Sequence, residues 1–552
     1  MIWDYLSNVN LQKLIGDEIL ADLELMLPSI CTDNNDQELF DINKKSTLKK
    51  IVSSFVTKSF FRKSNNILDI LNLLPESAID ECIEQIKPEY TKLGFNEKIE
   101  FIASNWNKEQ YNETLIKWAG LPEEYIIKKE KKTSSSLLLP LPKSPYKTLK
   151  DYQVSVFLDA QKDLEEFNSR FIIQMPTGSG KTRTAMEIVT DFINNSQEDT
   201  TVIWLAHSEE LCEQALECFI EIWQHVGKKE LTAYRCWGAD TVIPKKIKNN
   251  AFIVAGFGKL NSALSRNEKA FSGFSDNVGL IIVDEAHKVM APTYTKVTKA
   301  LINVQKGTRV VGLTATPGRH IADPEGNAAL SKFFFNKCFS IKLPHGEAGN
   351  VISYLKDRKV LSKVDICPIK CSTTTELTAE EKRYLEQNFD FPAGFLRRLG
   401  DDKVRNIEIL KRLQIAAKDG HQILFFACSV EHSKFICSLL IYLGYKAAHI
   451  DGSTDKETRQ YLLRQFKNNE LQIICNFGVL STGFDAPKTD VVCIARPTQS
   501  IVLYSQMIGR GLRGPAIGGT EKCTLINVRD NIKNLPNYQR IFDYFDDYWA
   551  EP

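Results

Sequence analysis

The chain has 552 residues, of which 43% are apolar and 25% are charged, and its formal net charge at pH 7 is +1. This composition is typical of a soluble globular protein with three or four domains, and it excludes binding of nucleic acid through a large overall positive charge. The opening residues, MIWDYLSNVN, lack a secretory signal pattern and no run of about 18 apolar residues occurs, so we expect a cytoplasmic protein without a membrane span.

The cysteine content indicates free thiols. The 13 cysteines include no CxxC pair, whereas a structural zinc site usually needs closely spaced pairs of ligands. We therefore expect buried thiols in a reducing compartment.

Residues 1–132 have a helical pattern. Apolar residues recur at three- and four-residue steps in 66–74 (NILDILNLL) and 78–86 (AIDECIEQI). The charged run KKEKK at 128–132 is followed by a proline-rich stretch. The sequence predicts an all-helical N-terminal accessory domain over 1–132 and a linker over 133–146. The expected helix boundaries within this domain are Pro28, Pro75, Pro88 and Pro122.

The remaining sequence predicts two α/β domains of one design, over residues 147–319 and 405–531. In both, short apolar runs alternate with helical stretches, which is typical of βαβ units and a parallel sheet. A connecting segment over 320–404, with a helix at 380–389, and a C-terminal helical tail over 532–552 complete the prediction. The expected strands are 171–175, 202–206, 252–255, 280–283 and 309–313 in the first domain, and 423–427, 447–450, 472–475, 491–495 and 524–528 in the second.

Residues 174–182 (QMPTGSGKT) have the pattern of a phosphate-binding loop, with Met175 in place of the first glycine. The loop lies between a predicted strand and a predicted helix, and its glycines allow backbone N–H groups to face phosphate oxygens. Lys181 would neutralise the β- and γ-phosphates, and Thr182 would offer its hydroxyl to Mg²⁺. The pattern predicts ATP and Mg²⁺ as cofactors. The expected nucleotide-binding residues of the loop are Thr177, Gly178, Ser179, Gly180, Lys181 and Thr182.

An acidic pair follows another predicted strand. Residues 284–287 (DEAH) come directly after the apolar run 280–283. Phosphoryl transfer needs one carboxylate to hold Mg²⁺ and a second to orient or deprotonate the attacking water. The order of the residues assigns Asp284 to the metal and Glu285 to the water.

Residues 506–513 (QMIGRGLR) are expected to supply the arginines of the site. Arg510 and Arg513 lie three residues apart on a predicted helix, so both guanidinium groups would project from one face. An arginine finger stabilises the charge of the transferring phosphoryl group and is worth about 10³–10⁵ in rate. Because this motif lies far from 174–182, we expect ATP to bind between the two domains, where hydrolysis would move one against the other.

This ordered set of motifs resembles the superfamily 2 helicases and translocases of the DEAH-box group, which have two RecA-like domains. The resemblance extends from about residue 147 to 531, and LKDYQ, AHSEEL, TGFDAP and QMIGRGLR are most similar to RadD-like repair proteins, UvsW-type phage enzymes and motor subunits of restriction enzymes. Gly256 departs from the pattern, where threonine is usual. The resemblance implies adenine recognition by Gln153, nucleotide contacts by Gly483 and Asp485, a catalytic role for Gln506, coupling by His287, Thr314 and Thr316, and a nucleic-acid contact by Thr482. Tracking along a phosphate backbone uses basic side chains and hydroxyls, which adds Ser208, Lys259, Arg397 and Arg398 as candidate nucleic-acid contacts.

We expect an ATP-dependent helicase or translocase that tracks along the phosphate backbone, with DNA favoured over RNA by the resemblance alone. Two alternatives stay open. The chain could be the motor subunit of a restriction or anti-phage defence complex that binds a partner nuclease through residues 1–132, or an ATP-switched nucleic-acid sensor. DNA repair is a further possible pathway, and the sequence predicts neither polarity nor oligomeric state.

Overall fold

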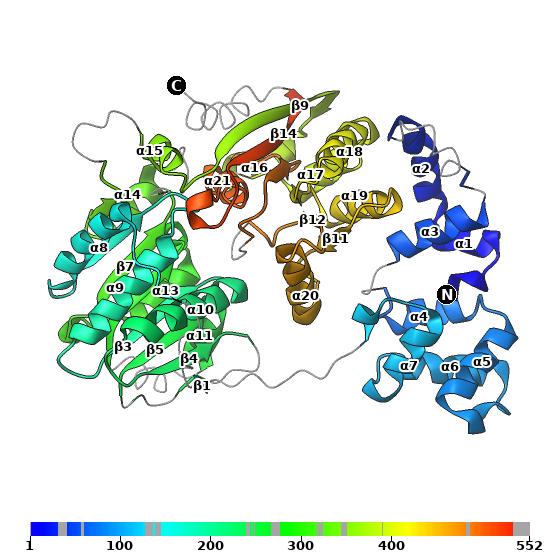
Figure 1. The fold of residues 1–552 in the computed structure, drawn as a ribbon, viewed down its shortest axis with the longest axis horizontal. Helices are drawn as coiled ribbons and strands as arrows, with labels where there is room; N and C mark the ends of the chain where they lie inside the picture. Colours follow the sequence, from blue (N-terminus) through cyan, green and yellow to red (C-terminus); the bar gives the residue numbers. More distant parts are fainter. Residues whose placement is uncertain are drawn as a thin grey trace.

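The computed structural model describes residues 2–30, 41–42, 44–56, 60–126, 136–137, 145–238, 243–244, 247, 249–266, 277–316, 324–343, 350–388, 390–481 and 486–533. They form a helical N-terminal domain and two α/β domains (Figure 1). None of the described helices is long and apolar enough to cross a membrane.

The N-terminal domain is helical, as predicted. Ser7 begins α1 by accepting a hydrogen bond from the backbone N–H of Asn10, and left-handed Gly120 ends α7. Pro75, Pro88 and Pro122 lie at the starts of helical segments, whereas Pro28 lies within α2, so it is not a boundary. The helices are α1 (Asn8–Ile15), α2 (Asp17–Ile30), α3 (Lys45–Phe55), α4 (Ser64–Leu71), α5 (Glu76–Ile86), α6 (Phe95–Asn105) and α7 (Glu109–Ala119).

The first α/β domain has an eight-stranded sheet in the order β1-β4-β5-β3-β6-β7-β2-β8, parallel except for β1. All five strands predicted here are present. Residues 136–137 of the predicted linker form β1, at the sheet edge, and the other residues of 127–144 lie outside the described part. The elements are β1 (Ser136–Leu137), α8 (Asp151–Leu164), β2 (Arg170–Gln174), α9 (Lys181–Asn195), β3 (Thr201–Ala206), α10 (Glu209–Val226), β4 (Thr232–Cys236), β5 (Ala251–Gly256), α11 (Phe257–Arg266), β6 (Val278–Asp284), α13 (Pro292–Leu301), β7 (Arg309–Thr314), α14 (Pro324–Phe333) and β8 (Cys338–Ser340).

The second α/β domain has a six-stranded parallel sheet in the order β11-β12-β10-β13-β14-β9. Its five predicted strands are also present, and α16 matches the helix predicted at 380–389. The elements are α15 (Val351–Asp357), β9 (Lys363–Glu376), α16 (Ala379–Asn388), α17 (Ala393–Gly400), α18 (Lys403–Lys418), β10 (Ile423–Phe426), α19 (Val430–Tyr442), β11 (Ala447–Ile450), α20 (Lys456–Lys467), β12 (Ile473–Asn476), β13 (Val491–Ile494), α21 (Ile501–Ile508) and β14 (Lys522–Lys533).

The predicted connecting segment, 320–404, is divided between the two sheets. β8 pairs with β2 in the first sheet, and β9 pairs with β14 at the edge of the second. β9 escaped prediction because an edge strand remains largely exposed and carries no continuous apolar run. Residues 532 and 533, predicted as the start of a helical tail, are the end of β14, and 534–552 lie outside the described residues.

The N-terminal domain packs on the second α/β domain, although the sequence joins it to the first (Figure 1). The Ser438 hydroxyl in α19 donates a buried 2.9 Å hydrogen bond to the carbonyl of Ser54 in α3. Phe55 and Phe435 meet edge to face with ring centroids 6.2 Å apart. Lys403 of α18 forms an ion pair with Asp22 of α2. Apolar residues of both domains form one continuous buried core.

Candidate ATP site between the two α/β domains

The phosphate-binding loop joins the end of β2 to the start of α9. Gly178 and Gly180 both have a φ of +85°, a left-handed conformation that other residues rarely adopt. A Cβ atom on Gly180 would also lie 2.5 Å from Nε2 of Gln153. Lys181 is the first residue of α9, where a helix end favours negative charge. The loop therefore offers backbone N–H groups, a helix N-terminus and an ammonium group to a phosphate chain.

The sheet topology brings the other predicted motifs to this loop. Strands β6, β7 and β2 are neighbours, and Asp284 pairs with Leu313 while Gln174 pairs with Thr314. The carboxyl ends of parallel strands lie at one edge of the sheet, which is where ligands bind in open α/β folds. The end of DEAH strand β6 therefore lies beside the end of β7 and the start of the phosphate loop.

The acidic pair is buried and lies near Lys181. Burial and the adjacent Glu285 carboxylate raise the pKa of Asp284 to about 6. Burial is the largest single influence on Glu285 and opposes its ionisation, but the electrostatic influences of Lys181, His287, Lys288 and His207 together outweigh burial and lower the pKa of Glu285 to about 2. Buried carboxylates this close together need a nearby cation. Their hard oxygen atoms, with the hydroxyl of Thr182, fit Mg²⁺.

A chain of side chains leads from Glu285 to the residues after β7. Nδ1 of His287 lies 3.3 Å from Oε2 of Glu285 and 3.4 Å from Oγ1 of Thr314. Thr314 in turn donates a 2.6 Å hydrogen bond from its hydroxyl to the carbonyl of Thr316. Burial lowers the pKa of His287 to about 4, so its ring is neutral at pH 7. The three predicted coupling residues thus lie in one contact chain with Glu285.

The second domain contributes residues 506–513 to this site, but Arg510 and Arg513 are not on a helix as predicted. Helix α21 ends at Ile508, and Arg510 lies in the following turn. The reason is close packing at two glycines, which also disfavour helix. A side chain on Gly509 would overlap Thr177, and one on Gly511 would overlap Cys523.

Both arginines are half-buried at the contact between the domains. Burial lowers the pKa of Arg510 and of Arg513 to about 10, while Glu285 favours the charged form of Arg510. Both remain cations at pH 7. A Cβ on Gly178 would lie 3.9 Å from Cγ of Arg513, so the phosphate loop lies close to the arginine motif. Gln506 is buried, and its Nε2 has no hydrogen-bond partner among the described residues.

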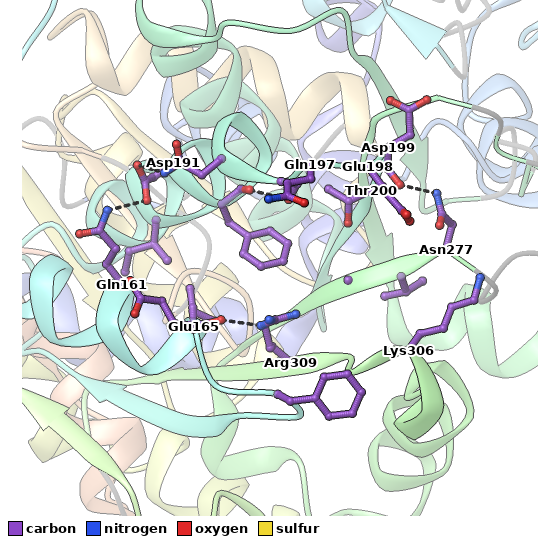
Figure 2. Close-up of a pocket in the computed structure, with 18 of the residues that line it drawn as sticks. Gln161, Glu165, Asp191, Gln197, Glu198, Asp199, Thr200, Asn277, Lys306 and Arg309 are labelled. Atoms are coloured by element: carbon purple, nitrogen blue, oxygen red, sulfur yellow. Dashed lines mark hydrogen bonds between the residues drawn. The ribbon is translucent and has the colours of Figure 1, made fainter.

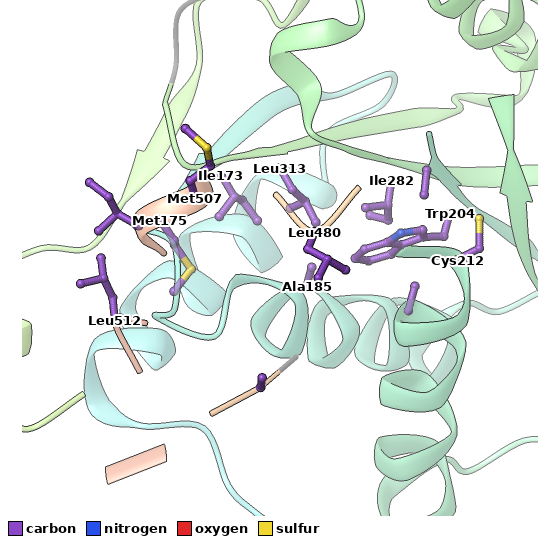
Figure 3. Packing of buried hydrophobic residues seen from close by; sticks show 14 of the residues in the cluster. Ile173, Met175, Ala185, Trp204, Cys212, Ile282, Leu313, Leu480, Met507 and Leu512 are labelled. Carbon is purple, nitrogen blue, oxygen red and sulfur yellow. The ribbon is translucent and has the colours of Figure 1, made fainter. Parts of the chain in front are cut away.

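Apolar packing closes the same contact. Met175, which replaces the first glycine of the loop pattern, belongs to one buried cluster with Met507 and Leu512 of the second domain (Figure 3). Leu361 also reaches the loop, because a Cβ on Gly178 would lie 3.3 Å from its Cδ2. Met175 thus supplies apolar surface at the domain contact that a glycine would lack.

Gln153, predicted to recognise adenine, lies against the phosphate loop. Its Nε2 donates to the Gly180 carbonyl at 3.3 Å and to Oγ1 of Thr184 at 3.1 Å, and its Oε1 accepts from the backbone N–H of Lys150 at 2.9 Å. These bonds fix the side chain at the loop. Of the other predicted nucleotide contacts, Gly483 and Asp485 lie outside the described residues.

The predicted nucleic-acid contacts do not form one cluster of free groups. Ser208 caps α10 by accepting from the backbone N–H of Leu211, and Nζ of Lys259 donates to the Gly238 carbonyl at 2.8 Å. Arg398 donates two hydrogen bonds, of 2.7 and 2.9 Å, to the carboxylate of Glu381. Arg397 is exposed, and Thr482 lies outside the described residues.

Sequence reasoning missed a set of ion pairs between the domains. Arg459 of α20 pairs with Glu210 of α10, and Nζ of Lys456 lies 3.8 Å from Oε2 of Glu209. Arg358, at the end of α15, pairs with Asp151 at the start of α8. Opposite charges at helix starts were a weak signal, because the sequence does not show which helices meet.

A cavity of about 840 Å³ lies at the opposite edge of the first sheet (Figure 2). Its lining includes Thr200, Val278 and Arg309, at the amino-terminal ends of β3, β6 and β7. Several of its polar side chains already bond to each other or to the backbone: Gln161 donates to Asp191 at 2.9 Å, and Arg309 donates to the Gly307 carbonyl at 3.2 Å. We therefore assign the nucleotide to the domain contact rather than to this cavity.

Comparisons with known proteins identify the family of the two α/β domains. The sequence model of the family described as Type III restriction enzyme, res subunit, matches residues 146–319, and that of the Helicase conserved C-terminal domain matches 405–514. A 51.5 kDa protein of a Lactococcus phage is 26% identical over 69% of this chain and 71% of its own length. The protein irc3 of Schizosaccharomyces pombe, assigned by its name to the mitochondrial ATP-dependent helicases, is 25% identical over 70% of this chain and 58% of its own length.

Weaker relatives are named both as DNA and as RNA helicases, such as the DNA helicase uvsW of phage T4 at 22% identity and the RNA helicase DBP3 of Saccharomyces cerevisiae at 21%. Among solved structures, the DUF1998 helicase MrfA bound to DNA has the same fold, with a TM-score of 0.50, 15% identity, and coverage of 73% of this chain and 51% of that one. The chain belongs to the superfamily 2 helicases, related to the restriction-motor branch. It is a helicase-family, ATP-dependent enzyme with two RecA-like domains.

Proposed function

We propose that the protein is a DNA translocase or helicase that hydrolyses ATP in the cleft between its two RecA-like domains and tracks along the phosphate backbone. The observation that carries the proposal is the close approach of Gly509 of the second domain to Thr177 of the phosphate loop, where a Cβ atom on the glycine would overlap the threonine side chain. A site built from both domains changes when they separate. ATP binding and hydrolysis are thereby linked to relative domain motion, which a motor needs.

Each residue of the site would have its own role in hydrolysis. Lys181 and the loop N–H groups would hold the phosphates, while Asp284 and the Thr182 hydroxyl would hold Mg²⁺, which would neutralise the developing negative charge. Glu285, kept ionised by Lys181, orients or deprotonates the attacking water. Arg510 and Arg513 stabilise the transferring phosphoryl group from across the cleft. Glu285, His287 and Thr314 form the contact chain by which this chemistry reaches the residues after β7.

DNA is proposed as the track because the matched family is named for a restriction enzyme, and restriction enzymes act on DNA. Tracking would use phosphate contacts from basic side chains, hydroxyls and helix N-termini, with Ser208, Lys259, Thr482 and Arg397 as candidates. The test is to measure ATP hydrolysis in the presence of single-stranded, duplex or forked DNA, or of RNA. The expected result is stimulation by DNA that is lost in Lys181→Ala and Glu285→Gln. A rate of ATP hydrolysis that none of the four nucleic acids changes would refute the proposal. Stimulation by RNA alone would refute the choice of DNA as the track.

A second candidate function is that of a motor subunit within a nuclease-containing restriction or defence complex. It is favoured by the family match and by the charge of residues 1–126, where 21 Asp and Glu outnumber 13 Lys and Arg. An acidic domain repels a polyanionic backbone, so its exposed face suits a protein partner better than nucleic acid. Co-purification of a nuclease that is lost when residues 1–126 are exchanged for another helical domain would support this candidate. Full DNA-processing activity of the purified chain alone would count against it.

A further inference from the structure

A second contact path leaves the catalytic carboxylates, on the side away from Thr314. Nζ of Lys288 lies 3.1 Å from Nε2 of His207. The sheet explains this meeting. Strands β3 and β6 are parallel neighbours in which Leu205 pairs with Val283. Residue 207, just beyond β3, therefore lies alongside the turn that follows Asp284.

The charges of the two groups suit a hydrogen bond from lysine to histidine. Burial lowers the pKa of His207 to about 4, and the positive charge of Lys288 acts in the same direction, so the ring is neutral at pH 7 and can accept. Burial also lowers the pKa of Lys288, while the carboxylates of Glu285 and Asp284 favour its charged form. Lys288 thus lies between the catalytic carboxylates, which favour its charged form, and a neutral histidine.

His207 leads directly to a helix that contacts the second domain. The next residue, Ser208, caps α10 through a 3.3 Å hydrogen bond from the backbone N–H of Leu211. Glu210, in the first turn of α10, forms an ion pair with Arg459 of α20. Nη2 of Arg459 also donates to the Asp451 carbonyl at 2.9 Å, which fixes the arginine after β11. Any movement of α20 relative to the first domain therefore acts on the start of α10.

We infer that the Lys288–His207 hydrogen bond is a positioning contact that links the catalytic Glu285, through the N-terminus of α10, to the interdomain ion pair Glu210–Arg459. This inference rests on the proposed function, because it names a route by which domain movement adjusts hydrolysis. This route is distinct from the chain through Thr314. It runs from Glu285 toward β3, whereas the chain through Thr314 runs toward β7 on the other side of β6. Lys288 interacts with the carboxylates of Glu285 and Asp284 electrostatically, so we class it as a positioning residue rather than a catalytic one.

The test is a double-mutant cycle between Lys288→Met and Glu210→Gln, read as the single-turnover rate of ATP hydrolysis at saturating ATP with and without duplex DNA. We expect Lys288→Met to lower the DNA-stimulated rate about 10-fold, within the 5–150-fold range of typical coupling. We expect the double variant to lose little more than either single variant, because both break one path. Lys288→Arg, which keeps a cationic donor, should restore most of the rate, and exposed Lys296→Met is the matched control.

Additive losses in the cycle, an unchanged rate in Lys288→Met, or an equal loss in Lys288→Arg would each overturn the inference. Thermal unfolding of every variant separates this effect from a general loss of structure. The cycle measured without DNA tests the same path in basal hydrolysis. If DNA does not stimulate the wild type, DNA is refuted as the track. The cycle without DNA would still show whether Lys288 and Glu210 are coupled.

Discussion

Gly509 of the second domain lies against Thr177 of the phosphate loop, so closely that a Cβ atom on Gly509 would overlap the threonine methyl group. The two residues are separated by more than 300 positions in the sequence and belong to different sheets. Residues 506–513 can therefore approach the phosphate loop this closely only because position 509 has no side chain. Gly509 thus contributes to the candidate ATP site by leaving room for Thr177.

Replacing Gly509 with alanine should impair the contact without unfolding either domain. Its backbone φ is not in the left-handed region, so alanine fits the local conformation but collides with Thr177. We expect kcat for ATP hydrolysis to fall by at least about 10-fold, since a displacement of about 1 Å at a reacting centre can cost about 100-fold. Gly452→Ala is the control, because a Cβ there meets nothing within 4 Å. Equal kcat values for the two variants would show that the domains do not close at this point.

Replacing Glu285 with glutamine should separate ATP binding from hydrolysis. The amide keeps the size of the side chain but cannot accept a proton, and a general base contributes about 10²–10⁴ in rate. We expect kcat to fall by that factor while the Kd of a fluorescent ATP analogue changes less than about threefold. Lys181→Ala provides the contrast, because it removes a phosphate contact and should weaken nucleotide binding itself. Hydrolysis by Glu285→Gln at the wild-type rate would assign the base to another residue.

The sequence predicted the parts of the fold that bury apolar surface on both faces. β3 (TVIWLA) is buried at all six positions, and such runs identify central strands of parallel sheets. The edge strand β9 is mostly exposed and has no continuous apolar run, so the sequence did not predict it. Local motifs predict the candidate catalytic residues, but the end of α21 before Arg510 depends on contacts of Gly509 and Gly511 with distant residues. Docking of Ser54 on Ser438 is likewise a tertiary contact that no local pattern records.

The arginine pair at 397 and 398 should divide into one stabilising residue and one free to bind nucleic acid. The Arg398 guanidinium lowers the pKa of Glu381 to about 2 through a direct hydrogen bond. Arg398→Ala should therefore reduce stability and change DNA affinity little, whereas Arg397→Ala should weaken DNA binding and reduce the slope of log K against log salt by about 1. Fluorescence anisotropy across a salt series measures both. An equal loss of affinity in the two variants would contradict this division.

The same ion pair has a defined pH dependence. The folded-state pKa of Glu381 lies below its unfolded value of about 4.3, so the pair stabilises the fold fully above that pH. Its contribution is lost as the pH falls from about 4.3 toward about 2. The difference in free energy of unfolding between wild type and Arg398→Ala, measured by urea denaturation, should therefore shrink as the pH is lowered from 5 to 3. A difference that grows on acidification would contradict the pairing.

The N-terminal domain should unfold together with the second RecA-like domain, because their apolar residues form one core. Phe435→Ala removes the ring that meets Phe55 and should cost about 2 kcal/mol, less than the 3–5 kcal/mol of a fully buried phenylalanine because Phe435 is only partly buried. Hydrogen exchange should then show faster exchange in α3 and α19 alike, while α9 in the first domain keeps its protection. Leu158→Ala, at a 54% exposed position on α8, is the matched control. Faster exchange in α19 with α3 unchanged would mean that the helical domain is tethered to the second RecA-like domain without sharing its core.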